Sequence, residues 1–252
     1  MLEIRKKDRR FPILNSYVDN LTMKQTIKEI EEIITQKKPT QHVVINASKI
    51  VLMEKDHNLN SIVNECPIIN ADGASIILAA KFLRIPLRER VTGIDLFQEL
   101  LKISNKKKYR VFLFGAKEHV VLKVKKFIEK TYPMISIVGY RNGFFSESEE
   151  AEIVSQISMS KADIVFVAFS SPKKEYWINK YLIEMNAPFV MGVGGSFDVI
   201  AGVTKRAPLW MQKFGLEWFY RFIQEPRRMW RRYIIGNLIF IYLIIKYKLK
   251  KD

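Results

Sequence analysis

Short apolar segments alternate with amphipathic segments over most of this chain. Segments such as 109–114 and 164–169 are five or six residues long and nearly all apolar, which suits strands buried on both faces of a sheet. Between them, segment 118–130 has apolar residues three and four positions apart, as in an amphipathic helix. The alternation predicts an α/β fold with a mainly parallel, Rossmann-like sheet and helices on both faces.

The chain is expected to start this pattern with a strand over residues 11–18, followed by a helix that begins at the capping box Thr22 to Gln25. A second helix is predicted over residues 74–83. Further strands are expected at 42–45, 67–69, 109–114, 135–140, 164–169 and 189–193.

Three parts follow from this organisation. Residues 1–10 are a basic N-terminal tail, residues 11–203 form the α/β domain, and residues 204–252 have no strand pattern. With 48% hydrophobic residues the chain has enough apolar side chains for a packed core. We therefore expect one α/β domain that carries an all-helical C-terminal appendage.

The positive charge lies mainly at the two ends of the chain. The net charge is +16, and residues 204–252 supply +9 of it, with twelve Lys and Arg against three acids. Residues 1–10 supply another +3. A polyanionic partner is therefore expected to meet the appendage, and the candidates are anionic lipid, a diphosphate or nucleic acid.

Localisation follows from three features of the sequence. Cys66 is the single cysteine, which excludes an intrachain disulfide, and the N-terminus lacks the apolar segment of a signal peptide. The strongest apolar window, 233–245, is about 13 residues long, whereas a membrane span needs roughly 20. We expect a cytoplasmic protein that binds the inner face of the cell membrane peripherally, with the lysines after residue 245 among lipid headgroups.

In parallel sheets the ligand binds beyond the carboxyl ends of the strands, which here selects Asn46, Asp72, Gly115, Gly194 and Gly195. Asp72 follows an apolar strand and precedes an apolar helix, so it either caps that helix or acts as a general base. The glycine cluster at 192–195 either binds a phosphate through backbone N–H groups or makes a tight turn after its strand. Position alone leaves both alternatives open.

Basic side chains near this edge are further candidates. Arg90 and Asp95 flank a glycine turn, although each also fits an ordinary surface or helix-start role. Arginines interleave with aromatic residues in the appendage, and guanidinium groups suit a diphosphate that leaves without a metal. The alternative is a solvated basic helix face. The basic candidates are Lys173, Lys174, Arg206, Arg221, Arg228 and Arg231.

The sequence gives no sign of a metal or a cofactor. The three histidines have no ligand spacing with one another or with Cys66, and no Asp-x-Asp pair occurs. A phosphate-binding Walker motif is absent, and the strand before Gly115 has one glycine where the dinucleotide fingerprint needs three. We predict neither a bound metal nor a cofactor.

The segment 192–228, GVGGSFDVIAGVTKRAPLWMQKFGLEWFYRFIQEPRR, closely resembles the signature of the WecG/TagA/CpsF glycosyltransferases, glycosyltransferase family 26. Other matching motifs are Ala71-Asp72-Gly73, Arg90-Val91-Thr92-Gly93-x-Asp95, Gly139-Tyr140-x-x-Gly143-Phe144 and Pro172-Lys173-x-Glu175-x-Trp177. The resemblance extends over residues 13–237, nearly the whole chain.

The resemblance implies a bacterial, metal-independent, inverting enzyme of cell-surface polysaccharide or teichoic acid synthesis. Such an enzyme transfers a sugar, typically N-acetylmannosamine or a related hexose, from a UDP-sugar to an acceptor linked to polyprenyl diphosphate. Asp72 then matches the proposed general base, and Arg221, Arg228 and Arg231 match arginines implicated in activity. We expect Gly194 and Gly195 to hold the diphosphate, and Asn46, Arg90 and Asp95 to position the sugars.

Two positions depart from the family pattern. Val44 stands where members such as TagA usually carry threonine, and Lys174 replaces the glutamine of a Pro-Lys-Gln-Glu motif. Both changes leave the donor sugar open. Two other functions are considered, a basic nucleic-acid-binding module and a non-enzymatic membrane scaffold. Neither accounts for the glycine and acid motifs at the strand ends, so we expect no nucleic-acid partner, while homo-oligomer formation stays open.

Overall fold

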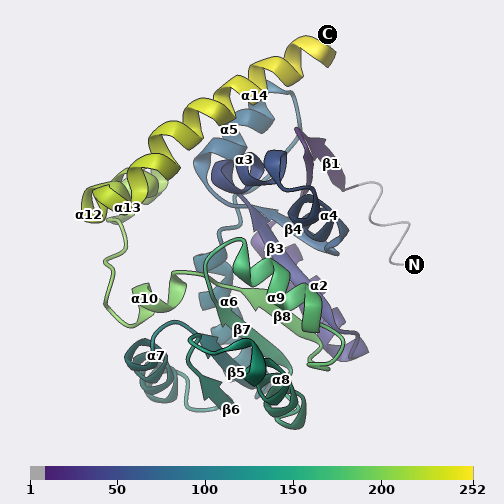
Figure 1. Ribbon diagram of the computed structural model, residues 1–252, viewed down its shortest axis with the longest axis vertical. Coiled ribbons are helices and arrows are strands. Elements are labelled where there is room, and N and C mark those ends of the chain that lie inside the picture. The colour runs from purple at the N-terminus through teal and green to yellow at the C-terminus, as the bar shows by residue number, and fades with distance from the viewer. Residues whose placement is uncertain (1–8, 252) are drawn as a thin grey trace.

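The computed structural model of the protein describes residues 9–251, without the side chains of Arg228, Arg232 and Lys251, so most of the basic tail lies outside the described residues. The chain folds around one six-stranded sheet (Figure 1). All of its strand pairs are parallel, and the strand order is β4-β3-β8-β7-β5-β6. The strands are β3 (Thr40–Ile45), β4 (Ile68–Ala71), β5 (Arg110–Gly115), β6 (Ser136–Arg141), β7 (Ile164–Ala168) and β8 (Phe189–Gly192).

Helices cover both faces of this sheet, as the sequence predicts. One face packs on α2 (Met23–Gln36), α6 (Gly93–Lys107) and α7 (Glu118–Thr131). The other packs on α3 (Ala47–Lys55), α4 (His57–Glu65), α5 (Ala74–Phe82), α8 (Glu150–Met159) and α9 (Lys173–Tyr181).

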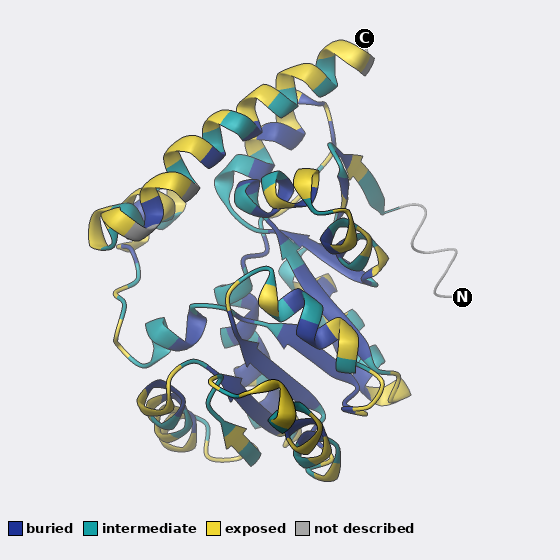
Figure 2. Ribbon diagram, in the orientation of Figure 1, coloured by how far each residue is buried: buried dark blue, intermediate teal, exposed yellow. Residues whose placement is uncertain are grey.

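Successive residues of β5 show how one strand serves both faces: Leu113 belongs to the first cluster of buried side chains, and Phe112 and Phe114 belong to the opposite one. Five of the strands are buried over nearly their whole length, whereas the edge strand β6 is partly exposed (Figure 2).

The prediction of one strand over residues 11–18 is wrong. The segment forms an antiparallel hairpin of β1 (Arg10–Ile13) and β2 (Ser16–Asp19), which is separate from the main sheet. The chain reverses at Leu14, whose φ of 55° is uncommon for a residue other than glycine. The turn contains no glycine or proline, so the polar pair Asn15-Ser16 reads as an interruption within one strand.

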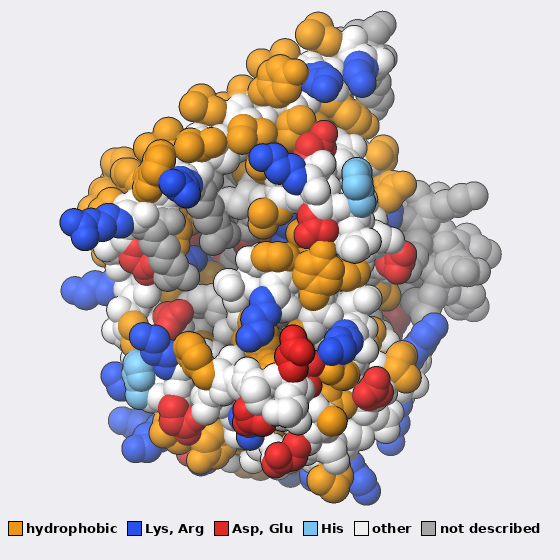
Figure 3. Space-filling view, viewed as in Figure 1, with side chains coloured by type: hydrophobic (Ala, Val, Ile, Leu, Met, Phe, Trp, Pro, Cys, Tyr) orange, Lys and Arg blue, Asp and Glu red, His pale blue; other side chains and the backbone are white. Residues whose placement is uncertain are grey.

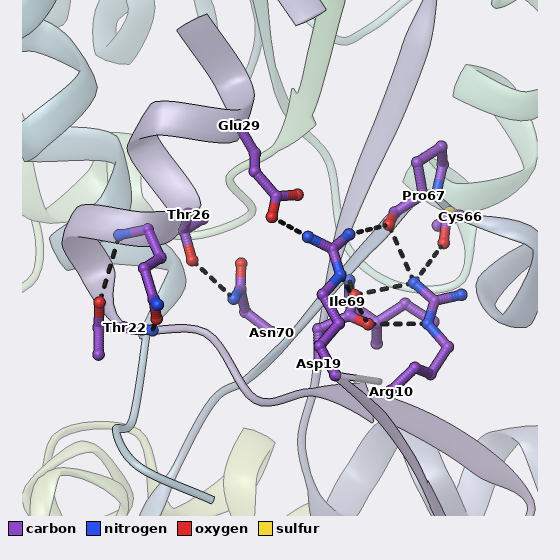
Figure 4. A network of polar contacts seen from close by, with 11 residues as sticks. Arg10, Asp19, Thr22, Thr26, Glu29, Cys66, Pro67, Ile69 and Asn70 are labelled. Carbon is purple, nitrogen blue, oxygen red and sulfur yellow. Dashed lines mark hydrogen bonds and ion pairs between the residues drawn. The ribbon is translucent and has the colours of Figure 1, made fainter. Parts of the chain in front are cut away.

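Polar contacts fix this hairpin to the start of β4 (Figure 4). The guanidinium of Arg10 donates to both carboxylate oxygens of Asp19 at 2.8 Å and to the carbonyl of Pro67 at 3.0 Å. Asp19, whose side chain is fully buried, also accepts the N–H of Ile69 at 2.7 Å. The hairpin thereby holds the strand that ends next to Asp72.

A buried polar chain joins β3, β4 and α2. Nε2 of His42 lies 2.8 Å from Oδ1 of Asn70. Nδ2 of Asn70 donates to Thr26 at 3.1 Å, a contact drawn in Figure 4. Because Asn70 uses its amide N–H toward Thr26, its oxygen accepts from His42, which places the imidazole proton on Nε2. The pKa of His42 is lowered to about 4, chiefly by burial; the hydrogen bond to Asn70 opposes this shift and nearby Lys49 adds to it. His42 is therefore a neutral structural residue at pH 7.

The C-terminal part is helical, as predicted. Helix α10 (Ser196–Ile200) precedes it, and the part after residue 203 contains α11 (Leu209–Lys213), α12 (Glu217–Gln224), α13 (Pro226–Trp230), a π-helical turn (Arg231–Ile235) and α14 (Gly236–Lys251). Helix α14 packs on α3 (Figure 1). Its residue Phe240 is buried among the apolar side chains of α3, α4 and α5. Within residues 9–251, no helix has both the length and the apolar content that a membrane crossing requires.

Candidate functional site

Three adjacent strands bring the main predicted site residues to one edge of the sheet. Asp72 follows β4, Asn46 follows β3, and Gly194 lies two residues after β8, and these strands are neighbours in the order β4-β3-β8. Gly115 ends β5, which β7 separates from β8, so it lies at the other half of the same edge. The candidate site is therefore the carboxyl end of β4, β3 and β8.

Asp72 is half-buried at this edge. Its N–H donates to the carbonyl of Ile45 at 2.8 Å and so continues the pairing of β4 with β3. The N-cap position of α5 is occupied by Gly73, whose φ is 95°. Asp72 thus precedes the cap residue, and the backbone pairing fixes its Cα beside the end of β3.

Asn46 has a local structural role. It is the N-cap of α3, and its side-chain oxygen accepts the N–H of Lys49 at 3.0 Å. The amide N–H group of Asn46, which the cap does not use, is suited to contact a sugar. Val44 lies beside Gly93, the first residue of α6, so the start of this helix reaches the same edge.

Helix α12 extends from the Asp72 loop to the glycine turn after β8. Gly215, just before α12, lies so close to Ala74 that a side chain at position 215 would collide with it. Farther along α12, the guanidinium of Arg221 occupies the space that a side chain on Gly195 would take, near the carboxylate of Asp198. The preceding Gly194 has a φ of 53°, which favours glycine. Appendage residues therefore contact both sides of the candidate site.

The structure brings Arg90, Asp95 and Arg206 together. They form ion pairs with protein groups in place of the expected contacts with a ligand. Arg206 Nη2 lies 2.5 Å from Asp95 Oδ1, and Arg206 Nε lies 3.4 Å from Glu217. Arg90 Nη1 lies 3.4 Å from the other carboxylate oxygen of Glu217. Asp95 also accepts the hydroxyl of Thr92, the N-cap of α6, at 2.6 Å. We call the four ion-paired residues the latch network, and they join the α/β domain to the appendage: Arg90, Asp95, Arg206 and Glu217.

Lys174 belongs to a buried cluster of charges. Its ammonium lies 2.9 Å from Glu175 and 2.5 Å from the hydroxyl of Ser171, and its methylene groups cover Gly192. Lys49 of α3 lies 2.7 Å from the same fully buried carboxylate. Burial raises the pKa of Glu175, but the two ammonium groups outweigh it and lower the pKa to about 2. The cluster keeps a net positive charge behind the glycine turn.

The remaining candidates lie farther from these contacts. Lys173 is exposed at the start of α9, with its ammonium 4.5 Å from the centre of the Phe145 ring. Arg231 is exposed in the π-helical turn, 5.3 Å from the Trp230 ring. Arg228 lies in α13, and its side chain is outside the described part of the structure. Over the described residues, no group of three or more His, Cys, Asp or Glu side chains could hold a metal ion.

Two residues that the sequence analysis did not select are central to this arrangement. Glu217 receives two arginines, and Lys49 pairs with Glu175. The i to i+4 spacing of Glu217 and Arg221 was a usable signal, since it places both on one face of a helix. Lys49 gave no such signal, because its partner is distant in sequence.

Known proteins resemble this chain over most of its length. The profile of the Glycosyl transferase WecG/TagA/CpsF family matches residues 11–252. The chain is 35% identical over 219 residues to an N-acetylglucosaminyldiphosphoundecaprenol N-acetyl-beta-D-mannosaminyltransferase of Bacillus subtilis, covering 87% of this chain and 81% of the relative.

A protein of the same name from Staphylococcus aureus is 33% identical over 251 residues, which cover 99% of this chain and 97% of the relative. The match to the family profile extends over both the parallel sheet and the appendage that contacts its carboxyl edge. The chain belongs to the WecG/TagA/CpsF family of glycosyltransferases.

Proposed function

We propose that the protein transfers N-acetylmannosamine, or a closely related hexose, from a UDP-sugar to N-acetylglucosamine on a polyprenyl diphosphate. The acceptor corresponds to the one in the names of the relatives. The product serves the synthesis of a bacterial cell-surface polymer such as teichoic acid. The reaction proceeds by a single displacement with inversion at the anomeric carbon and needs no metal.

The observation that carries this proposal is the position of the appendage across the carboxyl edge of β4, β3 and β8. Gly215 contacts Ala74, two residues after Asp72, and Arg221 contacts Gly195. In this proposal the carboxylate of Asp72 and the guanidinium of Arg221 act on the ligand from two sides of this edge. The buried Nε of Arg221 has no hydrogen-bond partner within the described part of the chain, so it is suited to donate to an anionic ligand.

In this proposal Asp72 takes the proton from the acceptor hydroxyl. The hydroxyl oxygen then forms a bond to the anomeric carbon while the bond to the UDP oxygen breaks on the opposite face. Arg221, with Arg228 and Arg231 from the same appendage, neutralises the charge that develops on the leaving diphosphate. The backbone at Gly194 and Gly195 holds that diphosphate.

Side chains on α14 support binding at a membrane surface. Exposed apolar residues follow one another along its outer side, and apolar side chains gather along this helix (Figure 3). The exposed residues are Leu238, Ile241, Tyr242, Ile245 and Leu249. Lys246 and Lys250 are exposed on the same helix and suit anionic headgroups. We propose peripheral binding to the inner face of the cell membrane, where the lipid-linked acceptor is found.

The test measures UDP release from a panel of UDP-sugars, with a short-chain polyprenyl diphosphate N-acetylglucosamine as acceptor and with EDTA present. We expect release with UDP-N-acetylmannosamine or a close relative, and only when the acceptor is added. Product analysis should show the inverted anomeric configuration. Absence of acceptor-dependent release over the whole panel would refute the proposed activity, and retention of configuration would refute the single displacement.

A further inference from the structure

Glu217 connects two arginines that come from different parts of the chain. Arg90 precedes α6 in the α/β domain, and Arg206 lies in the segment between α10 and α11. Each guanidinium has a nitrogen 3.4 Å from a different carboxylate oxygen of Glu217. One carboxylate therefore ties the start of α12 to the α/β domain both directly and through the connecting segment.

The contact extends into the α/β domain. Arg206 also pairs with Asp95 of α6, with Nη2 2.5 Å from Oδ1. Arg90 donates to the carbonyl of Gln212 at 3.3 Å. Gln212 lies in α11, so Arg90 holds both α11 and the start of α12. The latch network thus uses groups on both sides of the boundary between the α/β domain and the appendage.

The same carboxylate lies one helical turn before Arg221 on α12. At the other end of the helix, the side chain of Gln224 pairs with the backbone of Lys205 through hydrogen bonds of 3.0 and 3.1 Å. Helix α12 is therefore fixed near both ends, and the contacts of Glu217 contribute to its rotation about its own axis. That rotation decides whether the guanidinium of Arg221 reaches Gly195.

We propose that Glu217 is a positioning residue: it holds α12 so that Arg221 lies over the glycine turn when the appendage is closed. This inference rests on the proposed role of Arg221 at the leaving diphosphate. The charged groups of the latch network are all partly exposed, and such pairs are individually weak. Losing one therefore changes the population of the closed appendage more than the stability of the whole fold.

A different role for Glu217 makes the opposite prediction. If its carboxylate occupied arginines that otherwise bind the donor phosphates, its removal would free Arg90 and Arg206 and tighten UDP binding. The positioning role predicts a lower turnover number with little change in UDP affinity. The Glu217→Gln variant, which keeps the size of the side chain and removes its charge, separates the two roles.

The experiment compares full-length wild type with Glu217→Gln and with Glu99→Gln. Glu99 is a matched control, because it is partly exposed on α6, as Glu217 is on α12, and pairs only with Lys102 of the same helix among the described residues. We expect kcat to fall about 10²-fold in Glu217→Gln, the effect of a small misplacement of a catalytic group. The Kd for UDP and the KM for the donor should change less than threefold, and Glu99→Gln should resemble wild type.

A double-mutant cycle checks that the effect acts through Arg221. In the Arg221→Ala background, Glu217→Gln should cause little further loss of kcat. Additive losses, an unchanged kcat in the single variant, or tighter UDP binding would each overturn the positioning role.

Trypsin gives a readout that does not depend on activity. Arg206 is partly buried in the segment that connects the two parts, and opening of the appendage should expose it to the protease. We expect faster cleavage there in Glu217→Gln than in wild type or Glu99→Gln, and equal rates would contradict the inference. If the wild type transferred no sugar while Glu217→Gln was still cleaved faster than wild type, the proposed function would be refuted and the structural role of Glu217 would stand.

Discussion

Arg221 occupies the space beside Gly195 that any side chain at position 195 would need. The first residue lies in the appendage and the second in the turn after the last strand of the sheet. This contact couples two segments 26 residues apart and places a guanidinium at the edge where parallel sheets bind ligands.

The Gly195→Ala substitution tests this contact directly. The φ of Gly195 is −74°, which alanine adopts without strain, so the new methyl group acts mainly by displacing the flexible end of Arg221. We expect a melting temperature close to that of wild type and a loss of roughly 10²-fold in kcat, comparable to the loss of one charge-stabilising donor. The measurements are thermal unfolding and the UDP-release assay.

Gly93→Ala is the matched control for that variant. A methyl group at Gly93 would lie 3.8 Å from Val44, an ordinary contact at the same edge of the sheet. Its activity should stay near wild type. Equal losses in both alanine variants would show that the edge tolerates no added volume, and the specific role of Arg221 would then fail.

Replacing Asp72 by asparagine tests the proposed general base. Asparagine keeps the shape of the side chain and cannot accept a proton, so UDP affinity should persist while kcat falls at least about 10²-fold. Circular dichroism and UDP binding serve as the folding controls. Turnover within tenfold of wild type would exclude Asp72 as the base.

Charges on the outer side of α14 should abolish membrane binding. Ile241 and Ile245 are exposed by 51% and 49%, so replacing both by glutamate leaves the core intact, whereas burying a carboxylate against lipid is costly. We expect the double variant to stay in solution in a sedimentation assay with phosphatidylglycerol vesicles that bind wild type. Ile183→Glu, at a residue exposed by 73% on the α/β domain, is the control and should still sediment with the vesicles.

The buried imidazole of His42 should make the fold sensitive to acid. Its pKa is lowered from 6.5 to about 4, chiefly by burial. Between pH 6.5 and pH 4 the imidazole is therefore protonated in the unfolded chain and neutral in the native state. Stability from this group is therefore complete above pH 6.5 and is lost as the pH falls toward 4, by roughly 2–4 kcal/mol.

Urea unfolding between pH 7 and pH 4 measures this effect. The free energy of unfolding should fall less steeply with decreasing pH in His42→Gln than in wild type, even if the variant is less stable at pH 7. His57→Gln, at an exposed position, should keep the wild-type slope. The same slope in all three proteins would show that another group causes the acid sensitivity.

The sequence by itself determined the α/β layers, the parallel sheet, the helical appendage and the edge at which Asp72 and the glycine turn lie. These features follow from short continuous apolar runs, from helical periodicity of 3.6 residues, and from the rule that short apolar strands alternating with helices pair in parallel. The hairpin at Leu14 escaped prediction because its turn conformation has no local signature in the residue types.

Only the tertiary structure decided how the charged candidates are used. Arg90, Asp95 and Arg206 each look like ligand-binding residues in the sequence, and the fold joins them through Glu217, more than 100 residues after Asp95. The partners of Lys49 and Arg221 are likewise set by the order of strands and by the path of the appendage. Ion pairs depend on distances between side chains, and for residues remote in sequence those distances exist only after the layers have packed.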